Sequence, residues 1–441
     1  MRKPLENVRI FADRRAQIGQ KAQGAAFILA SHPEYVRNNT VHHPYRQDSN
    51  FYYLTGFEEP ESIFVFRPGM KPEAVLFVRK KNMERETWDG FRFGPDAAQT
   101  EFKMDKTFPI EEFETQIPQL LKGVDKLYYR RFKNSDMDEK VDHALLDLKA
   151  SQSRTGFGLL PIYDADEFLG EFRLRKGDSD ISNLRKACEI SADAHTETMK
   201  YIKPGMNEKE VHGFFVYQLL KRGAAREGYN GIFASGNNAT TLHYVFNDQN
   251  LKAGELLLVD AAGEFNYFTS DITRTYPING RFNEEQAEVY EGVLKIQKDL
   301  IDMVKPGLPF QILQDTATSM LTDLILELGL LTGRKEDIIK TLEHKKYYPH
   351  GIGHFLGMDV HDNGMYFSKK TNEPVPIEEN MVFTIEPGIY IPEYDQTVAE
   401  EYRGIGIRIE DNIRVTNNGA EVLTAKAPKE IADLEKIIGS Y

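Results

Sequence analysis

The first third of the chain alternates short apolar runs with polar stretches. Three segments have the β-branched and aromatic content of buried strands: GAAFILA (24–30), SIFVFRPG (62–69) and AVLFVRK (74–80). The charged segment RKKNMERE (79–86) predicts an exposed edge or loop. Residues 155–178 lack a clear period and contain glycine and proline, which predicts a linker. We therefore expect a smaller α/β domain over residues 1–165.

Beyond the linker, apolar residues recur at helical spacing. The pattern predicts a helix that opens near Ser179 and Asp180, both good N-cap residues, and stops at the Lys-Pro-Gly of 203–205. A second helix opens at Asn283 and stops at the Lys-Pro-Gly of 305–307. Each of these helices is followed by another amphipathic helix.

Each helix pair leads into the same strand pattern. LKAGELLLVDAAG carries Asp260, and IEENMVFTIEPG carries Glu386 at the corresponding place. Each half then returns with a second acidic strand, bearing Asp271 or Glu410. The parallel predicts a duplicated α/β unit, although a shared order of elements without duplication would look similar.

Strand periodicity predicts where these acids point. Asp260 and Asp271 have ten residues between them, so a hairpin with an even-numbered loop would place them opposite one another, about 4.5–5.5 Å apart at Cβ. In GIGIRIEDN the isoleucines face one side, and Arg408 and Glu410 face the other. Each acid therefore lies on the polar face of a strand whose other face is core.

A histidine, His354 in HGIGHFLG, joins the four acids. Taken singly, each acid is best explained as solvated or ion-paired on a half-exposed sheet. Four carboxylates and an imidazole together carry too much negative charge to be buried without cations. The set predicts a site for two divalent ions, and its oxygen-rich donors favour Mn²⁺ over a thiolate-loving metal. Such a pair lowers the pKa of a bridging water and polarises a carbonyl, which suits metal-assisted hydrolysis.

Composition excludes several classes of protein. The chain has 441 residues and a formal net charge of −13, which argues against a broad nucleic-acid-binding face. Its one cysteine, Cys188, excludes an intrachain disulfide framework and suits a reducing compartment, so we expect a cytoplasmic protein. The apolar run at 24–30 is too short to span a bilayer, so we expect no membrane association.

The order of the five candidate ligands resembles that of the pita-bread metallopeptidases, which include methionine aminopeptidase, prolidase, aminopeptidase P and the metal-free creatinase. The resemblance covers residues 176–425, and YRQDSNFYYLTGFEEPES (45–62) is more specifically similar to aminopeptidase P. It implies a mixed α/β (α+β) fold in which two pseudo-symmetric α/β halves enclose the metals. This pita-bread catalytic domain, over residues 176–441, would follow the smaller α/β N-terminal domain.

The resemblance also implies a role for each ligand. Asp271 and Glu410 would bridge two divalent ions. Asp260 would complete one metal, and His354 with Glu386 would complete the other. Glu386 would also exchange a proton with the solvent between the metals.

Further residues receive roles from the same resemblance. His361 would hydrogen-bond the peptide near the scissile bond, and His243 would bind it from across the cleft. The residues expected around the proline ring of a substrate are His350, Val360, Tyr390 and Arg408. On residue type alone, the two histidines could make only local hydrogen bonds, Tyr390 could be a plain strand aromatic, and Arg408 could serve only to orient Glu410.

The N-terminal domain is expected to act in oligomerisation and substrate access. In the aminopeptidase P pattern Trp88, the only tryptophan, would reach from a neighbouring subunit into the active site. This implies a homo-oligomer, a dimer or a tetramer. A partly buried anchor within one subunit is the simpler alternative for this residue.

These expectations converge on a metal-dependent Xaa-Pro aminopeptidase. It would hydrolyse the N-terminal bond of peptides with proline second, using a hydroxide between two metals. Prolidase, restricted to Xaa-Pro dipeptides, has the same metal set and stays an open alternative. A metal-free pita-bread binding protein is disfavoured because no ligand is missing. Methionine aminopeptidase is disfavoured because about 170 residues precede the catalytic half.

Overall fold

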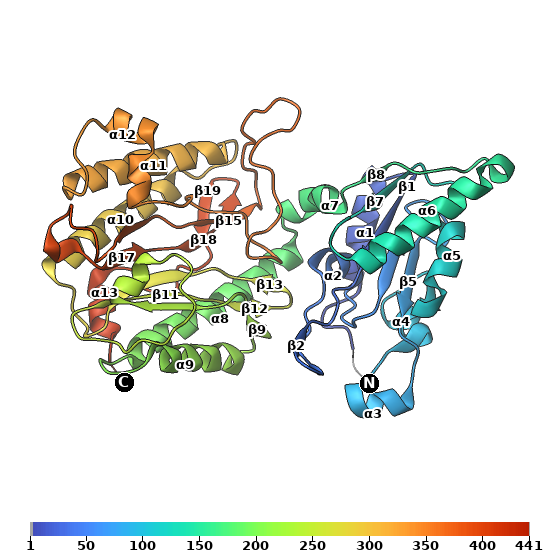
Figure 1. Ribbon diagram of the computed structural model, residues 1–441, viewed down its shortest axis with the longest axis horizontal. Helices are drawn as coiled ribbons and strands as arrows, with labels where there is room; N and C mark the ends of the chain where they lie inside the picture. The colour runs from blue at the N-terminus through green and yellow to red at the C-terminus, as the bar shows by residue number, and fades with distance from the viewer. Residues whose placement is uncertain (1–2, 441) are drawn as a thin grey trace. The chain divides into compact units, whose positions relative to one another are not determined.

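The computed structural model describes residues 3–440 and divides into two compact units between Phe172 and Arg173 (Figure 1). The expected linker has more secondary structure than we predicted, because α7 (Ala165–Leu174) spans the division. The glycine and proline residues in and near this segment favoured the prediction of a linker over that of a helix. In the N-terminal unit, Leu169 of this helix is buried and Phe168 packs on Tyr128, with ring centroids 4.5 Å apart.

The N-terminal unit is built on a six-stranded sheet of order β6-β5-β4-β1-β7-β8. The sheet strands are β1 (Ala25–Ala30), β4 (Ile63–Phe66), β5 (Ala74–Val78), β6 (Lys106–Pro109), β7 (Lys126–Tyr129) and β8 (Ile162–Tyr163), and a separate hairpin is formed by β2 (Val36–Asn38) and β3 (Val41–His42). The helices are α1 (Arg9–Lys21), α2 (Ser49–Thr55), α3 (Met83–Asp89), α4 (Gly94–Glu101), η1 (Ile110–Glu112), α5 (Phe113–Leu120) and α6 (Ser135–Thr155).

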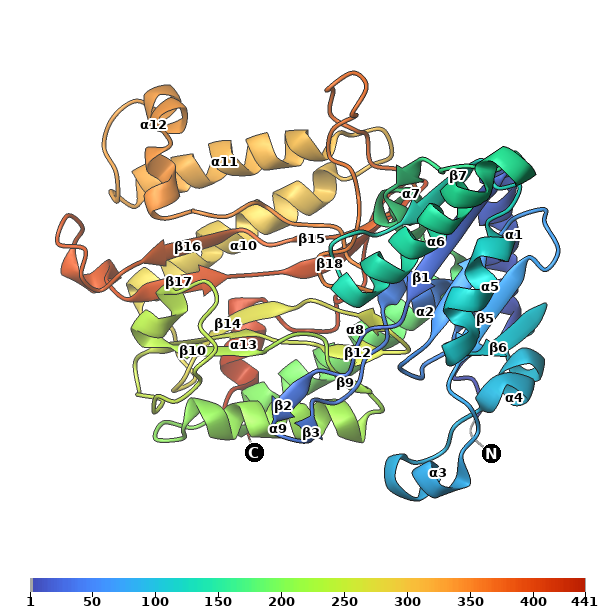
Figure 2. The same cartoon turned by 45° about the vertical axis from the view of Figure 1, so that its right-hand side comes forward.

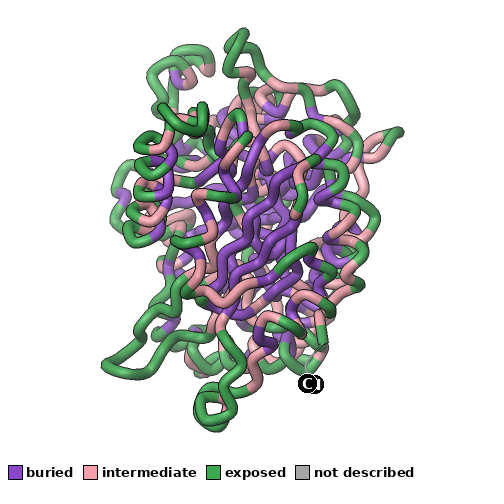
Figure 3. The backbone as a smooth tube through the Cα atoms, turned by 90° about the vertical axis from the view of Figure 1, so that its right-hand side faces the viewer, coloured by how far each residue is buried: buried purple, intermediate pink, exposed green. Residues whose placement is uncertain are grey.

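The three predicted strands of this unit are confirmed as β1, β4 and β5. Nearly all of their apolar residues are buried, and Figure 3 shows the sheet strands as a purple band with green turns at their ends. The RKKNMERE segment is largely exposed, as predicted, but its second half begins α3 rather than forming an edge or loop. Asn82 caps that helix by accepting from Arg85 N at 3.0 Å, and Glu84 and Glu86 favour its positive N-terminal end.

The second unit contains two helix pairs and short antiparallel sheets of order β10-β11-β14, β13-β12-β9, β15-β18-β19 and β16-β17. Its helices are α8 (Asp178–Tyr201), α9 (Glu208–Lys221), η2 (Gly236–Thr240), α10 (Glu284–Met303), α11 (Phe310–Glu327), α12 (Lys335–Thr341), η3 (Glu343–Lys346), η4 (Glu400–Tyr402) and α13 (Ile431–Ile437). Its strands are β9 (Arg226–Glu227), β10 (Ile232–Ser235), β11 (Leu256–Asp260), β12 (Gly263–Phe265), β13 (Phe268–Thr269), β14 (Thr273–Pro277), β15 (Val382–Ile385), β16 (Gly388–Ile391), β17 (Ile405–Arg408), β18 (Asp411–Thr416) and β19 (Gly419–Val422).

The repeated order of elements in this unit is confirmed. In Figure 2 the α8–α9 pair and the α10–α11 pair lie on opposite sides of the strands, and each pair precedes its own acidic hairpin. The second pair begins as predicted, because Asn283 and Gln286 form a reciprocal capping box. Both long helices end before a Lys-Pro-Gly, since proline cannot continue the backbone hydrogen bonds.

The predicted register of the first acidic hairpin is wrong. Asp260 pairs with Thr273, two residues beyond Asp271, because β12 and β13 form a smaller hairpin inside the connection. Asp271 lies just outside the ladder, so the two carboxylates are not directly opposite one another. In the second half Ile385 pairs with Asp411, which puts the next residues, Glu386 and Glu410, beside each other.

Candidate metal centre

Four of the five predicted ligands, the acids, lie at the ends or interruptions of strands. Asp260 ends β11, and Asp271 comes just before β14. Glu386 stands between β15 and β16, and Glu410 between β17 and β18, where the ladder changes partners. His354 comes from the loop ahead of β15. At each such place the backbone leaves its regular ladder, and the side chain can turn into the space between the two halves.

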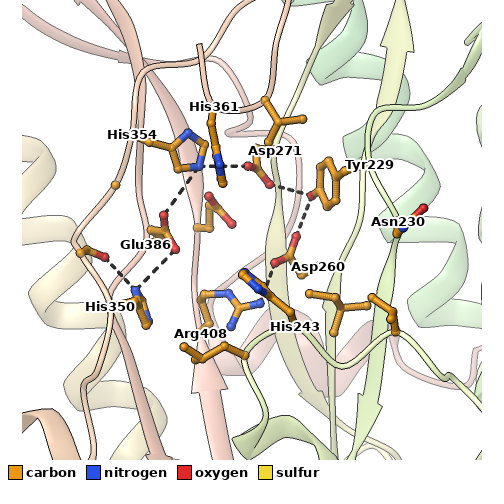
Figure 4. Close-up of a pocket in the computed structure, with 17 residues that line it drawn as sticks. Tyr229, Asn230, His243, Asp260, Asp271, His350, His354, His361, Glu386 and Arg408 are labelled. Atoms are coloured by element: carbon orange, nitrogen blue, oxygen red, sulfur yellow. Dashed lines mark hydrogen bonds and ion pairs between the residues drawn. The ribbon is translucent and has the colours of Figure 1, made fainter. Parts of the chain in front are cut away.

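All five line one pocket of about 620 Å³ in the second unit (Figure 4). Its lining consists of Tyr229, Asn230, Ile232, Leu242, His243, Val245, Asp260, Asp271, His350, Gly351, Gly353, His354, Val360, His361, Glu386, Arg408 and Glu410. The predicted site residues outside the ligand set are His361, His243, Arg408, His350, Val360, Tyr390 and Trp88. The structure brings the first five of these into this lining and leaves out Tyr390 and Trp88.

Distances within the ligand set suit cation binding. One ligand atom each from Asp271, His354 and Glu410 lie within 4.8 Å of one another. His354 Nε2 is 3.3 Å from Asp271 Oδ2 and 3.8 Å from Glu386 Oε1. Its Nδ1 lies 3.1 Å from the carbonyl of Phe355, which leaves Nε2 as the nitrogen that faces the acids.

Tyr229 is a site residue that our sequence reasoning missed. Its hydroxyl lies 2.7 Å from Asp260 Oδ1 and 2.6 Å from Asp271 Oδ1, so it links the two carboxylates of the first half. Burial and the charges of these acids raise the pKa of Tyr229 well above its usual value, so the phenol stays protonated and can donate. A tyrosine in a GYNG turn carries no periodic signal that would have found it.

Arg408 orients a different acid from the one we considered. Its guanidinium donates to Asp260 Oδ2 at 2.6 Å, to the Thr273 hydroxyl at 3.1 Å and to the Tyr390 hydroxyl at 3.0 Å. Thr273 in turn donates to Glu410 Oε2 at 2.7 Å. Arg408 therefore holds Asp260 directly and reaches Glu410 only through Thr273.

The remaining predicted residues take up different positions. His350 Nε2 lies 2.7 Å from the Tyr390 hydroxyl, so Tyr390 is buried behind the pocket wall. The rings of His361 and His354 are 4.3 Å apart. His243 faces them across the pocket in Figure 4. Trp88 belongs to the N-terminal unit, on α3, and is 81% exposed.

The charges of the pocket fit divalent cations. Burial raises the pKa of Glu386 to about 7, because His354 and Arg408 offset only part of the cost of its charge. Burial, Asp271 and Glu386 raise the pKa of Glu410 well above its usual value. Carboxylates that repel one another in a buried site are stabilised by positive charge, and oxygen donors with one imidazole suit divalent metals.

Comparison with known proteins agrees with this geometry. The model of metallopeptidase family M24 matches residues 182–417, and that of the aminopeptidase P N-terminal domain matches residues 11–128. The chain belongs to metallopeptidase family M24. The predicted family, the mixed α/β fold class and the enzyme class are thus confirmed.

Full-length relatives support the M24 assignment. The chain is 38% identical to the Xaa-Pro aminopeptidase of Haemophilus influenzae, over 97% of this chain and 96% of that one. It is 35% identical to that of Escherichia coli, over 96% of each chain. The structure of Pseudomonas aeruginosa aminopeptidase PepP superposes with a TM-score of 0.94 at 39% identity, and covers 98% of each chain. Among residues 3–440, this M24 chain has no helix with the length and apolar character needed to cross a bilayer.

Proposed function

We propose that this M24 enzyme removes the N-terminal residue from peptides whose second residue is proline. The observation that carries the proposal is the convergence of Asp260, Asp271, His354, Glu386 and Glu410 on one pocket, in a chain related over its full length to Xaa-Pro aminopeptidases.

The same five residues would hold two divalent ions. Bound cations would supply a water of lowered pKa as the nucleophile and would polarise the scissile carbonyl. The oxygen-rich donors favour Mn²⁺.

Protein side chains would carry the remaining steps. Glu386, with Oε2 3.7 Å from His350 Nδ1, would accept a proton from the attacking water and pass it toward the leaving proline nitrogen. His361 would donate to the developing oxyanion, and His243 would bind the peptide from the opposite wall. The proline ring would pack against His350 and Val360, which both line the pocket.

We also propose that the enzyme works as a cytoplasmic homo-oligomer. Trp88 is exposed on α3 of the N-terminal unit and would reach the pocket of a neighbouring subunit. A role for this unit in oligomerisation and substrate access follows from that placement. The cytoplasmic location rests on Cys188, a single buried thiol with no possible intrachain disulfide partner.

An assay on an Xaa-Pro tripeptide, with and without added Mn²⁺, tests the proposal. We expect release of the first residue, loss of turnover in chelator and recovery with Mn²⁺. Asp260→Asn should lose most of this activity and keep its fold by circular dichroism. An Xaa-Pro dipeptide in parallel separates this activity from that of prolidase. Wild-type turnover by Asp260→Asn in metal-stripped buffer would contradict the mechanism.

A further inference from the structure

A buried glutamate, Glu208, closes the segment that carries His243, which means that it hydrogen-bonds both ends of that segment and holds them together. Glu208 lies in the first turn of α9 and is fully buried. Its Oε1 accepts from Ser235 N at 2.7 Å, from the Ser235 hydroxyl at 2.7 Å and from Asn238 Nδ2 at 3.1 Å. Its Oε2 accepts from the Tyr244 hydroxyl at 2.8 Å and from Gln249 N at 3.0 Å.

All five donors belong to residues 235–249, and three of them lie at its ends: the N–H and hydroxyl of Ser235 and the N–H of Gln249. One carboxylate therefore closes this segment at both ends and through Tyr244 in the middle. The backbone of α9 adds to the closure, because Glu208 N donates to Gln249 O at 2.8 Å. His243 is the residue directly before Tyr244, and its own side chain is exposed to the pocket. The position of the imidazole thus depends on the anchored backbone beside it.

The hydrogen-bond pattern requires an acceptor at both oxygen positions of this side chain. Each oxygen of Glu208 faces a backbone N–H, that of Ser235 on one side and that of Gln249 on the other. A glutamine has one acceptor and one NH₂ group, so either orientation of its amide would set that NH₂ against one of these N–H groups. A buried donor left without an acceptor is destabilising, and here the segment could relieve the conflict only by moving.

We propose that Glu208 is a positioning residue, which acts on the substrate through His243 by closing segment 235–249. The proposal rests on the proposed function, because that function gives His243 its role. Glu208 itself is fully buried and is not part of the pocket lining.

A double-mutant cycle tests the proposal with Glu208→Gln, His243→Ala and the double variant, assayed on an Xaa-Pro tripeptide with saturating Mn²⁺. A group displaced by about 1 Å can cost roughly 100-fold in rate, so Glu208→Gln should lose up to about this factor in kcat/KM. In the His243→Ala background the same change should cost little, because the group that it positions is already gone.

A matched control is Glu264→Gln, which alters another buried glutamate of this unit. Glu264 lies on β12, and its Oε1 is 2.6 Å from Nη1 of Arg226. Its effect should be the same with and without His243. Bound metal, measured by elemental analysis, and the melting temperature show whether each variant is folded. Equal losses from Glu208→Gln in both backgrounds would overturn the proposal. If Glu208→Gln does not fold, Tyr244→Phe removes one of the five bonds and enters the same cycle. Failure of the wild type to cleave Xaa-Pro peptides would instead contradict the proposed function.

Discussion

At the scale of single residues, the centre depends on side chains that hold the ligands. Tyr229 links Asp260 and Asp271, and Arg408 fixes the other oxygen of Asp260. The two acids of the first half are therefore oriented by neighbouring side chains. Partners of this kind commonly matter nearly as much as the ligands they orient.

We expect Tyr229→Phe to reduce Mn²⁺ affinity and activity by roughly 10–100-fold, because the two acids lose their common donor. Tyr290→Phe is the matched control, since that buried tyrosine donates to the carbonyl of Lys429 at 2.8 Å, outside the pocket. Titration with Mn²⁺, followed by calorimetry and by turnover, measures both effects. Equal Mn²⁺ affinities for Tyr229→Phe and the wild type would show that the hydrogen bonds of Tyr229 to Asp260 and Asp271 do not contribute to metal binding.

At the scale of elements, the pocket depends on the close approach of β17 to η2. A Cβ at Gly406 would lie 2.3 Å from the carbonyl oxygen of Ala239, so only glycine fits there without movement. Since β17 also carries Arg408, this contact connects the stability of the unit with the geometry of its site.

Gly406→Ala should destabilise the protein by about 1–3 kcal/mol, because backbone rather than a flexible side chain must move. Gly213→Ala is the control: a Cβ there meets nothing within 4 Å in the middle of α9, so it should stabilise by about 0.5–1 kcal/mol. Urea unfolding of both variants gives the comparison. A neutral Gly406→Ala would mean that β17 and η2 separate at little cost.

The N-cap of helix α2 in the N-terminal unit should make the stability of the protein depend on pH. Asp48 caps this helix by accepting from Phe51 N at 2.8 Å and pairs with Lys133. Burial alone would raise the pKa of Asp48, but the charge and hydrogen bond of Lys133, with the Phe51 N–H and His32, together lower the pKa below 3.8. The stabilisation is therefore complete above pH 3.8 and is lost as the pH falls through the lower pKa of the folded state.

Asp48→Asn should thus be less stable than the wild type at pH 7, and the difference should shrink as the solution is made more acid. Asp13→Asn, at an exposed position on α1 of the same unit, should follow the wild type throughout. Melting temperatures between pH 7 and strong acid measure the trend. A difference between Asp48→Asn and the wild type that grows on acidification would contradict the sign.

At the scale of the whole molecule, the repeat places acids from two halves of one unit in a shared pocket. Metal binding should therefore stabilise this unit, because the crowded carboxylates repel one another without cations. Mn²⁺ at about 100 times its dissociation constant would add about 2.7 kcal/mol.

Glu410→Gln tests this coupling with a defined sign. Without metal it should be at least as stable as the wild type, since the cost of burying and ionising this carboxyl beside Asp271 and Glu386 is gone. With Mn²⁺ the wild type should gain much more in melting temperature than the variant. A large and equal gain in both proteins would show that the cations bind elsewhere.

The local pattern of the sequence was sufficient to predict many of the strands and helix ends of this protein. The strands at 24–30, 62–69 and 74–80, the two Lys-Pro-Gly helix ends and the repeated acidic hairpins all follow from periodicity and from the chemistry of proline and helix caps. The sequence also predicted five candidate ligands, and the structure brings all five to one pocket. These features depend on residues a few positions apart.

Tertiary structure decided the rest, because the contacts involved join distant parts of the chain. Arg408 meets Asp260 across 148 positions, and Tyr229 meets Asp271 across 42. No short-range period records such pairs, and a hairpin inserted between Asp260 and Asp271 changed their register without changing their spacing. The sequence by itself determined which residues have the right chemistry for a metal centre. Packing of the two halves determined which of them meet and what holds them in place.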